Sequence, residues 1–240
     1  MRPLGSSDVL SAWEEGRQRS STHRALVILW RAFPELSPED VSGLPLGARA
    51  DLLLQVYGQN AGPKLDGVCV CPKCAAQVAV SVDIAELTRR AQCAIPPIDI
   101  DVGRRRFRFR PPSSDDLLAI RACGSAEEAR EALLARCIIE PEADDAASAR
   151  LPDETVAELE RQLGDCDPLA EIVLDLTCPD CGVQWRAELD VVDFVWEALD
   201  GRARQLLFDI DALARAYGWS EPEILALSPA RRGWYVDRVS

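Results

Sequence analysis

The chain contains only one histidine, His23, and only one methionine among its 240 residues. Histidine is the commonest general acid or base in enzymes, so a histidine-based catalytic triad is not expected. The sequence also lacks a phosphate-binding loop, a glycine-rich dinucleotide fingerprint, an HExxH motif and a GxSxG motif. Its many carboxylates are scattered and form no evident acid–base pair. These absences predict a protein that is not an enzyme, with His23 as an exposed or helix-capping residue.

Long apolar runs, a basic charge balance and a secretory leader are also missing. No apolar run approaches the roughly 18 residues that span a bilayer, so no membrane partner is expected. Acidic residues (40) outnumber lysine and arginine (27), and the formal net charge of −13 disfavours binding to nucleic-acid phosphates. Nine cysteines, an odd number, without a leader indicate a reducing compartment rather than a disulfide framework. We therefore expect a cytoplasmic protein.

Two cysteine knuckles are the strongest signal that is present. The segments Cys71-Pro72-Lys73-Cys74 and Cys178-Pro179-Asp180-Cys181 lie 107 positions apart (178 minus 71, and 181 minus 74). The same offset matches Asp83 with Asp190 and aligns the apolar residues after each knuckle. Those apolar residues are Val78, Val80, Val82, Ile84 and Leu87 in the first copy, and Trp185, Ala187, Leu189, Val191 and Phe194 in the second. The pattern predicts an internal duplication of strand, knuckle, strand and helix start.

One Cys-x-x-Cys motif supplies two thiolates, whereas a structural zinc ion takes four ligands in a tetrahedron. The two knuckles therefore predict one shared zinc site with the ligands Cys71, Cys74, Cys178 and Cys181. Such a site leaves no open position for water, which argues against metal catalysis. Iron is an alternative, because the run from Cys178 to Gly182 is similar to a rubredoxin loop. Thiol pairs without metal, packed as small apolar residues, are another.

The remaining cysteines have no partner at ligand spacing. Cys123 and Cys137 lie on predicted helices, where we expect them to be core residues. Cys93 and Cys166 are isolated, and Cys69 is close enough to the first knuckle to be a spare thiolate. Thioredoxin-type redox chemistry is disfavoured for the knuckles, because each is followed by an alternating strand rather than a helix.

Alternating strands next to helical periodicity predict an α+β fold. It consists of duplicated zinc-ribbon-like β-hairpins that share one four-cysteine site, with N-terminal, inserted and C-terminal helices. The predicted regions are an N-terminal helical region (1–62), the first zinc-knuckle half with its following strands (63–112), a helical insertion (113–165), the second zinc-knuckle half (166–200), and the continuation of a long helix with a C-terminal helical tail (201–240). Within the insertion we expect a helix over 126–139 and an acidic loop over 140–152.

The most basic segment runs from Arg104 to Arg110 and alternates arginine with phenylalanine. In a strand, three arginines face one way and Phe107 and Phe109 face the other. One interpretation is a basic stripe for an acidic partner or nucleic acid. The interpretation that we favour is a buried phenylalanine face with a solvated arginine face that protects a sheet edge from further pairing.

Asp190 is predicted to cap the longest helix, which continues to Ala216 and ends at Gly218. Its apolar residues recur at three- and four-residue steps, which is typical of helix pairs. We expect the helix to pack on the N-terminal helices, with docking of a partner as the alternative. Aromatic residues near the terminus either seal a core or anchor another protein. The candidate partner-binding residues are Trp196, Trp219, Trp234 and Tyr235.

Several segments together carry a family resemblance. They are Leu10–Glu14, the two knuckles, Phe107–Ser113, Ala214–Ser220 and Ile224–Ser228. The Tyr-Gly-Trp-Ser run followed by Glu-Ile-Leu-Ala-Leu is the most specific. In this order the segments resemble the T4-type baseplate hub assembly chaperone family of contractile phage tails and phage-like contractile injection systems.

The resemblance implies a non-enzymatic assembly factor or structural component of a baseplate hub. Its partners would be baseplate hub or tail proteins, and the protein would remain cytoplasmic or be incorporated into the particle. An alternative function is a zinc-ribbon adaptor of transcription or another nucleic-acid machine, which would use the segment from Arg104 to Arg110.

Overall fold

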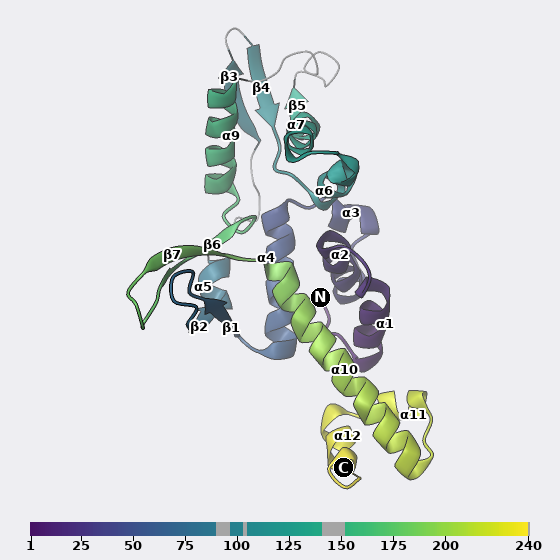
Figure 1. Cartoon of the computed structure of the whole chain (residues 1–240). Coiled ribbons are helices and arrows are strands. Elements are labelled where there is room, and N and C mark those ends of the chain that lie inside the picture. Colours follow the sequence, from purple (N-terminus) through teal and green to yellow (C-terminus); the bar gives the residue numbers. More distant parts are fainter. Residues whose placement is uncertain (90–96, 103–104, 141–151, 240) are drawn as a thin grey trace.

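The computed structural model describes residues 1–89, 97–102, 105–140 and 152–239. These residues form helices and small antiparallel sheets, which confirms the predicted α+β class. In Figure 1, helices occupy the centre and the cysteine-bearing hairpins project from one side. A small sheet with its helices lies at the top of the view, and the C-terminal helices lie at the bottom.

The first four helices belong to the central layer. Their bounds are α1 (Ser6–Gly16), α2 (Ser21–Ala32), α3 (Pro38–Ser42) and α4 (Leu46–Ala61). Ser20 caps α2, because its side chain accepts a hydrogen bond from the backbone N–H of His23. The N-cap of α4 is a proline without a side-chain acceptor, and the Gly47 N–H donates instead to the buried carboxylate of Asp167 at 3.0 Å. A segment 120 residues away thus stabilises the start of α4.

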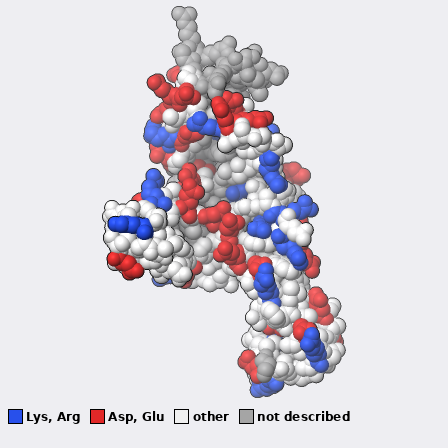
Figure 2. All heavy atoms as spheres, viewed as in Figure 1, with Lys and Arg blue, Asp and Glu red and all other residues white. Residues whose placement is uncertain are grey.

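The two knuckles lie in antiparallel hairpins, as the alternating residues predicted. Strand β1 (Lys64–Val70) pairs with β2 (Gln77–Asp83), and β6 (Ile172–Thr177) pairs with β7 (Gln184–Leu189). Each hairpin is a separate two-stranded sheet. Acidic side chains gather on the face between these hairpins and the central helices (Figure 2).

An aspartate caps the helix that follows each hairpin. Asp83 accepts from the Ala85 N–H at the start of α5 (Ile84–Thr88), and Asp190 accepts from two backbone N–H groups at the start of α10 (Val191–Tyr217). Helix α10 has 27 residues and ends at Gly218 with φ of 69°, so the predicted long helix is confirmed. Within the described residues, no helix has the length and apolarity needed to cross a bilayer.

The main core lies where α10 packs against α1, α2 and α4. Its fully buried side chains include Leu26, Ile28, Leu29, Leu53 and Leu54. Each such side chain contributes about 1.5 to 3 kcal/mol by leaving water. Residues of both hairpins join the same core, among them Leu65 of β1 and Ile172 of β6. The hairpins are therefore continuous with the helical layer.

A second, smaller core lies under a three-stranded sheet in the order β3-β4-β5. Phe107 and Phe109 are buried there, with ring centroids 6.2 Å apart. The elements of this part are β3 (Ile98–Val102), β4 (Arg105–Phe109), α6 (Ser114–Ala119), the 3₁₀ turn Ile120–Ala122, α7 (Ala126–Cys137), β5 (Ile138–Glu140) and α9 (Asp153–Cys166). The burial of both rings confirms the predicted phenylalanine face. The expected protection of a sheet edge by the arginines was wrong, because β4 is the central strand and pairs with both β3 and β5.

One helix prediction in this part was wrong. Residues 138 and 139 were expected to continue α7, but they lie in β5, because Ile138 pairs with Phe109 of β4. Helical propensity was overridden by a pairing partner remote in sequence. Of the predicted acidic loop, residues 141–151 lie outside the described residues, as do Cys93 and Arg104.

A buried carboxylate, Asp116, ties the small sheet to α6 and α7. It receives hydrogen bonds from Arg110 at 2.6 and 2.9 Å, from Arg136 at 3.0 Å, and from the backbone and side chain of Ser113 at 2.9 Å. Burial acts to raise the pKa of Asp116, but the hydrogen bonds from Arg110 and Ser113 outweigh it and lower the pKa to about 2.

We expect replacement of Asp116 by asparagine to flatten the acid dependence of stability. The pKa of about 2 in the folded state lies below the unfolded value of about 3.9. The charged Asp116 carboxylate therefore stabilises the folded state fully above about pH 4, and this stabilisation is lost as the pH falls through about 2. It amounts to about 1 to 2 kcal/mol, a range that allows for solvent screening of the partly exposed arginines. Urea unfolding between pH 2 and 7 measures it.

The control for this experiment is Asp115→Asn, at the exposed neighbour whose carboxylate accepts a surface hydrogen bond from Ser42. It should keep the steep acid dependence of the unmodified protein. Equal pH profiles for Asp116→Asn and the unmodified protein would contradict the assignment.

The C-terminal tail folds back on the end of α10. Helices α11 (Glu221–Leu225) and α12 (Pro229–Val236) both pack against it. The junction contains a buried ion pair, with Arg232 Nε 3.0 Å from Asp209 Oδ2. Arg232 also donates to the Ser6 side chain at 3.2 Å, so one guanidinium joins α12, α10 and α1.

Candidate metal centre

Each knuckle is a tight turn held by two backbone hydrogen bonds. The Cys71 N–H donates to Ala76 and the Ala75 N–H donates back to Cys71, at 2.9 and 3.0 Å. The second knuckle repeats both bonds at the same distances, around Cys178. The residue after the second cysteine is left-handed in both turns, with φ of 59° at Ala75 and 70° at Gly182. The left-handed conformation costs alanine about 1 to 2 kcal/mol and glycine almost nothing, so the first turn is held under strain.

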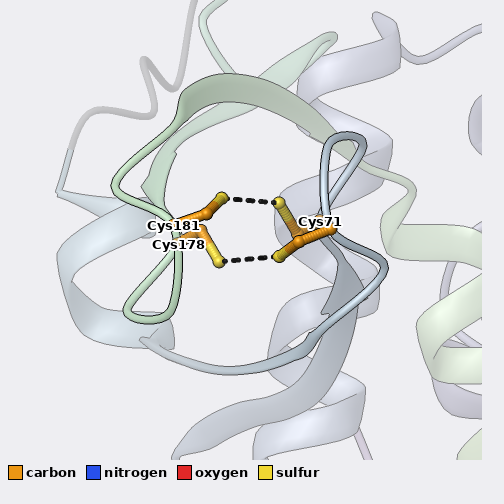
Figure 3. Close-up of side chains that lie close together, drawn as sticks. Cys71, Cys178 and Cys181 are labelled. Carbon is orange, nitrogen blue, oxygen red and sulfur yellow. Dashed lines mark hydrogen bonds between the residues drawn. The ribbon is translucent and has the colours of Figure 1, made fainter.

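The structure brings the four predicted cysteines together. The Sγ atoms of Cys71, Cys74, Cys178 and Cys181 all lie within 4.8 Å of one another. The closest approaches join the two hairpins: 3.7 Å between Cys71 and Cys181, and 3.6 Å between Cys74 and Cys178. Figure 3 shows Cys71 on one hairpin facing Cys178 and Cys181 on the other. The prediction that two distant knuckles form one four-cysteine cluster is confirmed.

The cluster is buried on one side and open on the other. Cys71 and Cys178, the first cysteine of each knuckle, are each 1% exposed, whereas Cys74 is exposed and Cys181 is half-buried. The first cysteine of each knuckle is therefore packed inside the protein, and the second cysteine is the more exposed of the two.

The thiols strongly affect one another's ionisation. Burial acts to raise the pKa of Cys71, but the backbone N–H groups of Cys74 and Lys73 outweigh it and lower the pKa to about 6. For Cys74, the Ala76 N–H acts to lower the pKa, but the neighbouring thiols of Cys181 and Cys71 raise it to about 12. Adjacent thiolates repel one another, so one ionises at the expense of the next. A divalent cation between the sulfurs removes this repulsion and favours four thiolates.

The donor set and its dimensions fit a tetrahedral ion. Zinc binds thiolate sulfur at about 2.3 Å, which places neighbouring sulfurs of a regular tetrahedron about 3.8 Å apart. The two closest sulfur pairs lie at 3.7 and 3.6 Å, and the others lie within 4.8 Å. The four cysteines could therefore hold a metal ion, and all-sulfur coordination suits zinc or iron.

Among the described residues, the other cysteines and the histidine lie outside the cluster. Cys137 is buried in the second core, as predicted, while Cys123 is half-exposed and was wrongly expected in a core. Cys69 lies on β1 but does not belong to the cluster, which rules out the spare-thiolate alternative in this structure. His23 lies beside Ser20, with Nδ1 3.0 Å from the hydroxyl oxygen, in keeping with its predicted place at a helix start.

The candidate partner-binding aromatics fall into two groups. Trp196 is only 7% exposed and fills the space beside Gly16, where an added Cβ would lie 2.5 Å from its ring, so it is a core residue. Trp219 and Trp234 instead each contact Tyr235 edge-to-face at the C-terminal end, with centroid distances of 4.9 and 5.0 Å. Trp234 is 52% exposed. Sequence periodicity alone could not separate the buried tryptophan from the exposed one.

Together these features define an α+β protein whose two hairpins present a four-cysteine cluster able to hold a metal ion. In comparisons with known proteins, no family model, no curated protein and no solved structure matches the chain.

Proposed function

We propose that the four-cysteine cluster is a structural zinc site that clamps two zinc-ribbon-like hairpins together. The observation that carries this proposal is the convergence of four sulfurs within 4.8 Å from segments more than 100 residues apart. Four thiolates satisfy a tetrahedral zinc ion completely, so the metal's work is to stabilise the fold. Iron in the same all-sulfur site is the alternative, and its colour and redox activity distinguish it from zinc.

The protein that this clamp stabilises is a non-enzymatic assembly factor or structural component of the baseplate hub of a contractile phage tail or phage-like injection system. The resemblance of the Tyr-Gly-Trp-Ser run and its neighbours to that family supports the setting. Exposed aromatic and aliphatic side chains at the C-terminal end support a protein-binding role, since such residues anchor interfaces. Phe208 is 71% exposed on α10, and Trp234 lies on α12.

The alternative, an adaptor of a nucleic-acid machine, depends on the basic strand β4. Arg106 and Arg108 lie 3.2 and 2.9 Å from Asp99 on the neighbouring strand, and Arg110 is paired with Asp116. These carboxylates neutralise much of the charge that would attract phosphate. The protein–protein role is therefore the one that we favour.

The assembly role predicts that deleting the gene from its own host prevents assembly of contractile particles. Electron microscopy of lysates measures this, and the intact gene supplied in trans should restore particles. A Trp234→Ala gene should restore fewer particles if the C-terminal aromatic surface binds a hub or tail protein. The matched control is Ile139→Ala, at a 41% exposed apolar residue on β5. Fully assembled particles in the deletion strain would refute the role.

A further inference from the structure

The two hairpins and α10 enclose a groove, and we infer that it binds an extended segment of a partner protein in which basic and apolar residues alternate. The segment lies along β1 as an added strand. This inference deepens the proposed function, on which it rests, because it gives the chemistry of the partner. It is independent of the aromatic surface at the C-terminal end.

The floor of the groove is apolar. The groove has a volume of about 480 Å³, within the range of ligand-binding clefts. Its apolar lining includes Leu65, Val68, Val82, Leu174, Leu189 and Phe194. They come from β1, β2, β6, β7 and α10, so the groove exists only when the two hairpins are held together. Phe194 is fixed by an edge contact with Tyr57, at 5.8 Å between ring centroids.

One wall of the groove is strand β1. Five consecutive residues of β1, from Leu65 to Cys69, border it. Consecutive residues of a strand point to opposite faces of the sheet. Because residues of both faces of β1 border the groove, the groove runs along the edge of this strand. In the described part of the chain, β1 pairs only with β2, which leaves that edge without a neighbouring strand. Val68 is 61% exposed there, and an unpaired apolar edge is the usual acceptor of an added strand.

The rim of the groove is acidic. Asp66, Glu188, Asp193 and Glu197 border it with exposed side chains, and no lysine or arginine lines it within the described residues. None of these four carboxylates forms an ion pair in the part of the chain that the structure describes. Figure 2 shows acidic side chains between the hairpins and the central helices. An apolar floor with an unneutralised acidic rim complements a segment that carries both apolar and cationic side chains.

The other possible occupants fit less well. Nucleic acid and acidic segments are repelled by the rim. A second copy of this chain has one suitable sequence, the arginine–phenylalanine strand β4, but its Phe107 and Phe109 are buried in the second core. The occupant is therefore a basic, partly apolar segment of a different protein.

The test uses the zinc-loaded full-length chain and a fluorescent seven-residue peptide of alternating lysine and valine, blocked at both ends. Fluorescence anisotropy should show saturable binding, and the corresponding glutamate–valine peptide should not bind. The same lysine–valine peptide N-methylated at alternate residues should lose binding, because a strand addition needs its backbone N–H groups. Equal binding of the N-methylated peptide would overturn the strand addition.

The binding site is then located with two triple variants of equal charge change. The first variant removes three carboxylates of the rim and should weaken binding of the lysine–valine peptide about tenfold; it is Asp66→Asn/Glu188→Gln/Glu197→Gln. The second variant removes three exposed carboxylates outside the groove and should leave the affinity for the peptide unchanged; it is Glu14→Gln/Glu154→Gln/Asp237→Asn. Equal weakening by both would mean attraction to net charge and would overturn the inference.

The free thiols give an independent readout. Bound peptide should slow alkylation of Cys69, which lines the groove, and leave the rate at Cys123 unchanged. Absence of protection at Cys69 would also overturn the inference. Zinc content is measured on the same samples. A protein that retains its zinc but does not bind the peptide would contradict this inference and leave the zinc proposal standing.

Discussion

Replacing Cys74 or Cys181 by serine is expected to release the metal and to unfold the hairpins. Structural zinc binding is worth about 10 to 16 kcal/mol in zinc-finger peptides, and a typical domain is stable by only about 5 to 15 kcal/mol. Residues such as Leu65 and Ile172 anchor the hairpins to the main core, but each hairpin is a separate two-stranded sheet, and such sheets are marginal alone. Elemental analysis and urea unfolding of the purified variants measure both effects.

The matched control is Cys69→Ser, on strand β1 and two residues before the first knuckle. Cys69 lies outside the four-cysteine cluster, so this variant should keep its zinc and most of its stability. Since Cys74 is exposed while Cys71 is buried, Cys74→Ser changes the ligand set with the least disturbance of packing. A Cys74→Ser protein that binds zinc as tightly and unfolds at the same urea concentration as the unmodified protein would refute the site.

The second large effect is expected at the junction of α10, α12 and α1. Arg232→Met removes one partner of a buried ion pair and leaves Asp209 charged, with the side-chain amide of Gln205 still donating to it at 2.8 Å. Breaking such a pair costs about 3 to 5 kcal/mol. Urea unfolding should show this loss, and hydrogen exchange should show faster opening of residues 229–236.

Two further variants make this prediction specific. Arg231→Met changes the exposed neighbour in the same helix and should alter stability by less than about 0.5 kcal/mol. The double variant Asp209→Leu/Arg232→Met should recover much of the loss, because two apolar residues replace the pair without leaving a buried charge. If the double variant were less stable than Arg232→Met alone, the buried pair would not be the cause.

The parts of the fold that could be predicted are those with strong local signals. Asp190, the apolar steps that follow it and Gly218 define the start, face and end of α10 within a single segment. The two Cys-x-x-Cys motifs predicted that the knuckles would lie together, because each supplies two thiolates and a closed structural metal site needs four. The alternation of Phe107 and Phe109 with arginine likewise predicted the buried face of β4.

The parts that escaped prediction depend on distant partners. Strand β5 exists because Ile138 finds Phe109, which helix propensity does not reveal. Asp167 caps α4 across 120 residues, and no pattern near Pro45 indicates it. The groove beside β1 likewise arises from six elements, α4, β1, β2, β6, β7 and α10, that meet only in the folded chain. Its acidic rim was visible in the sequence only as part of a negative net charge.

The most direct test of the account is X-ray absorption at the metal of the purified protein, together with elemental analysis. The account predicts about one zinc ion per chain with four sulfur ligands at about 2.3 Å. A protein without bound metal, whose four knuckle cysteines all react freely with a thiol reagent in the native state, would contradict it.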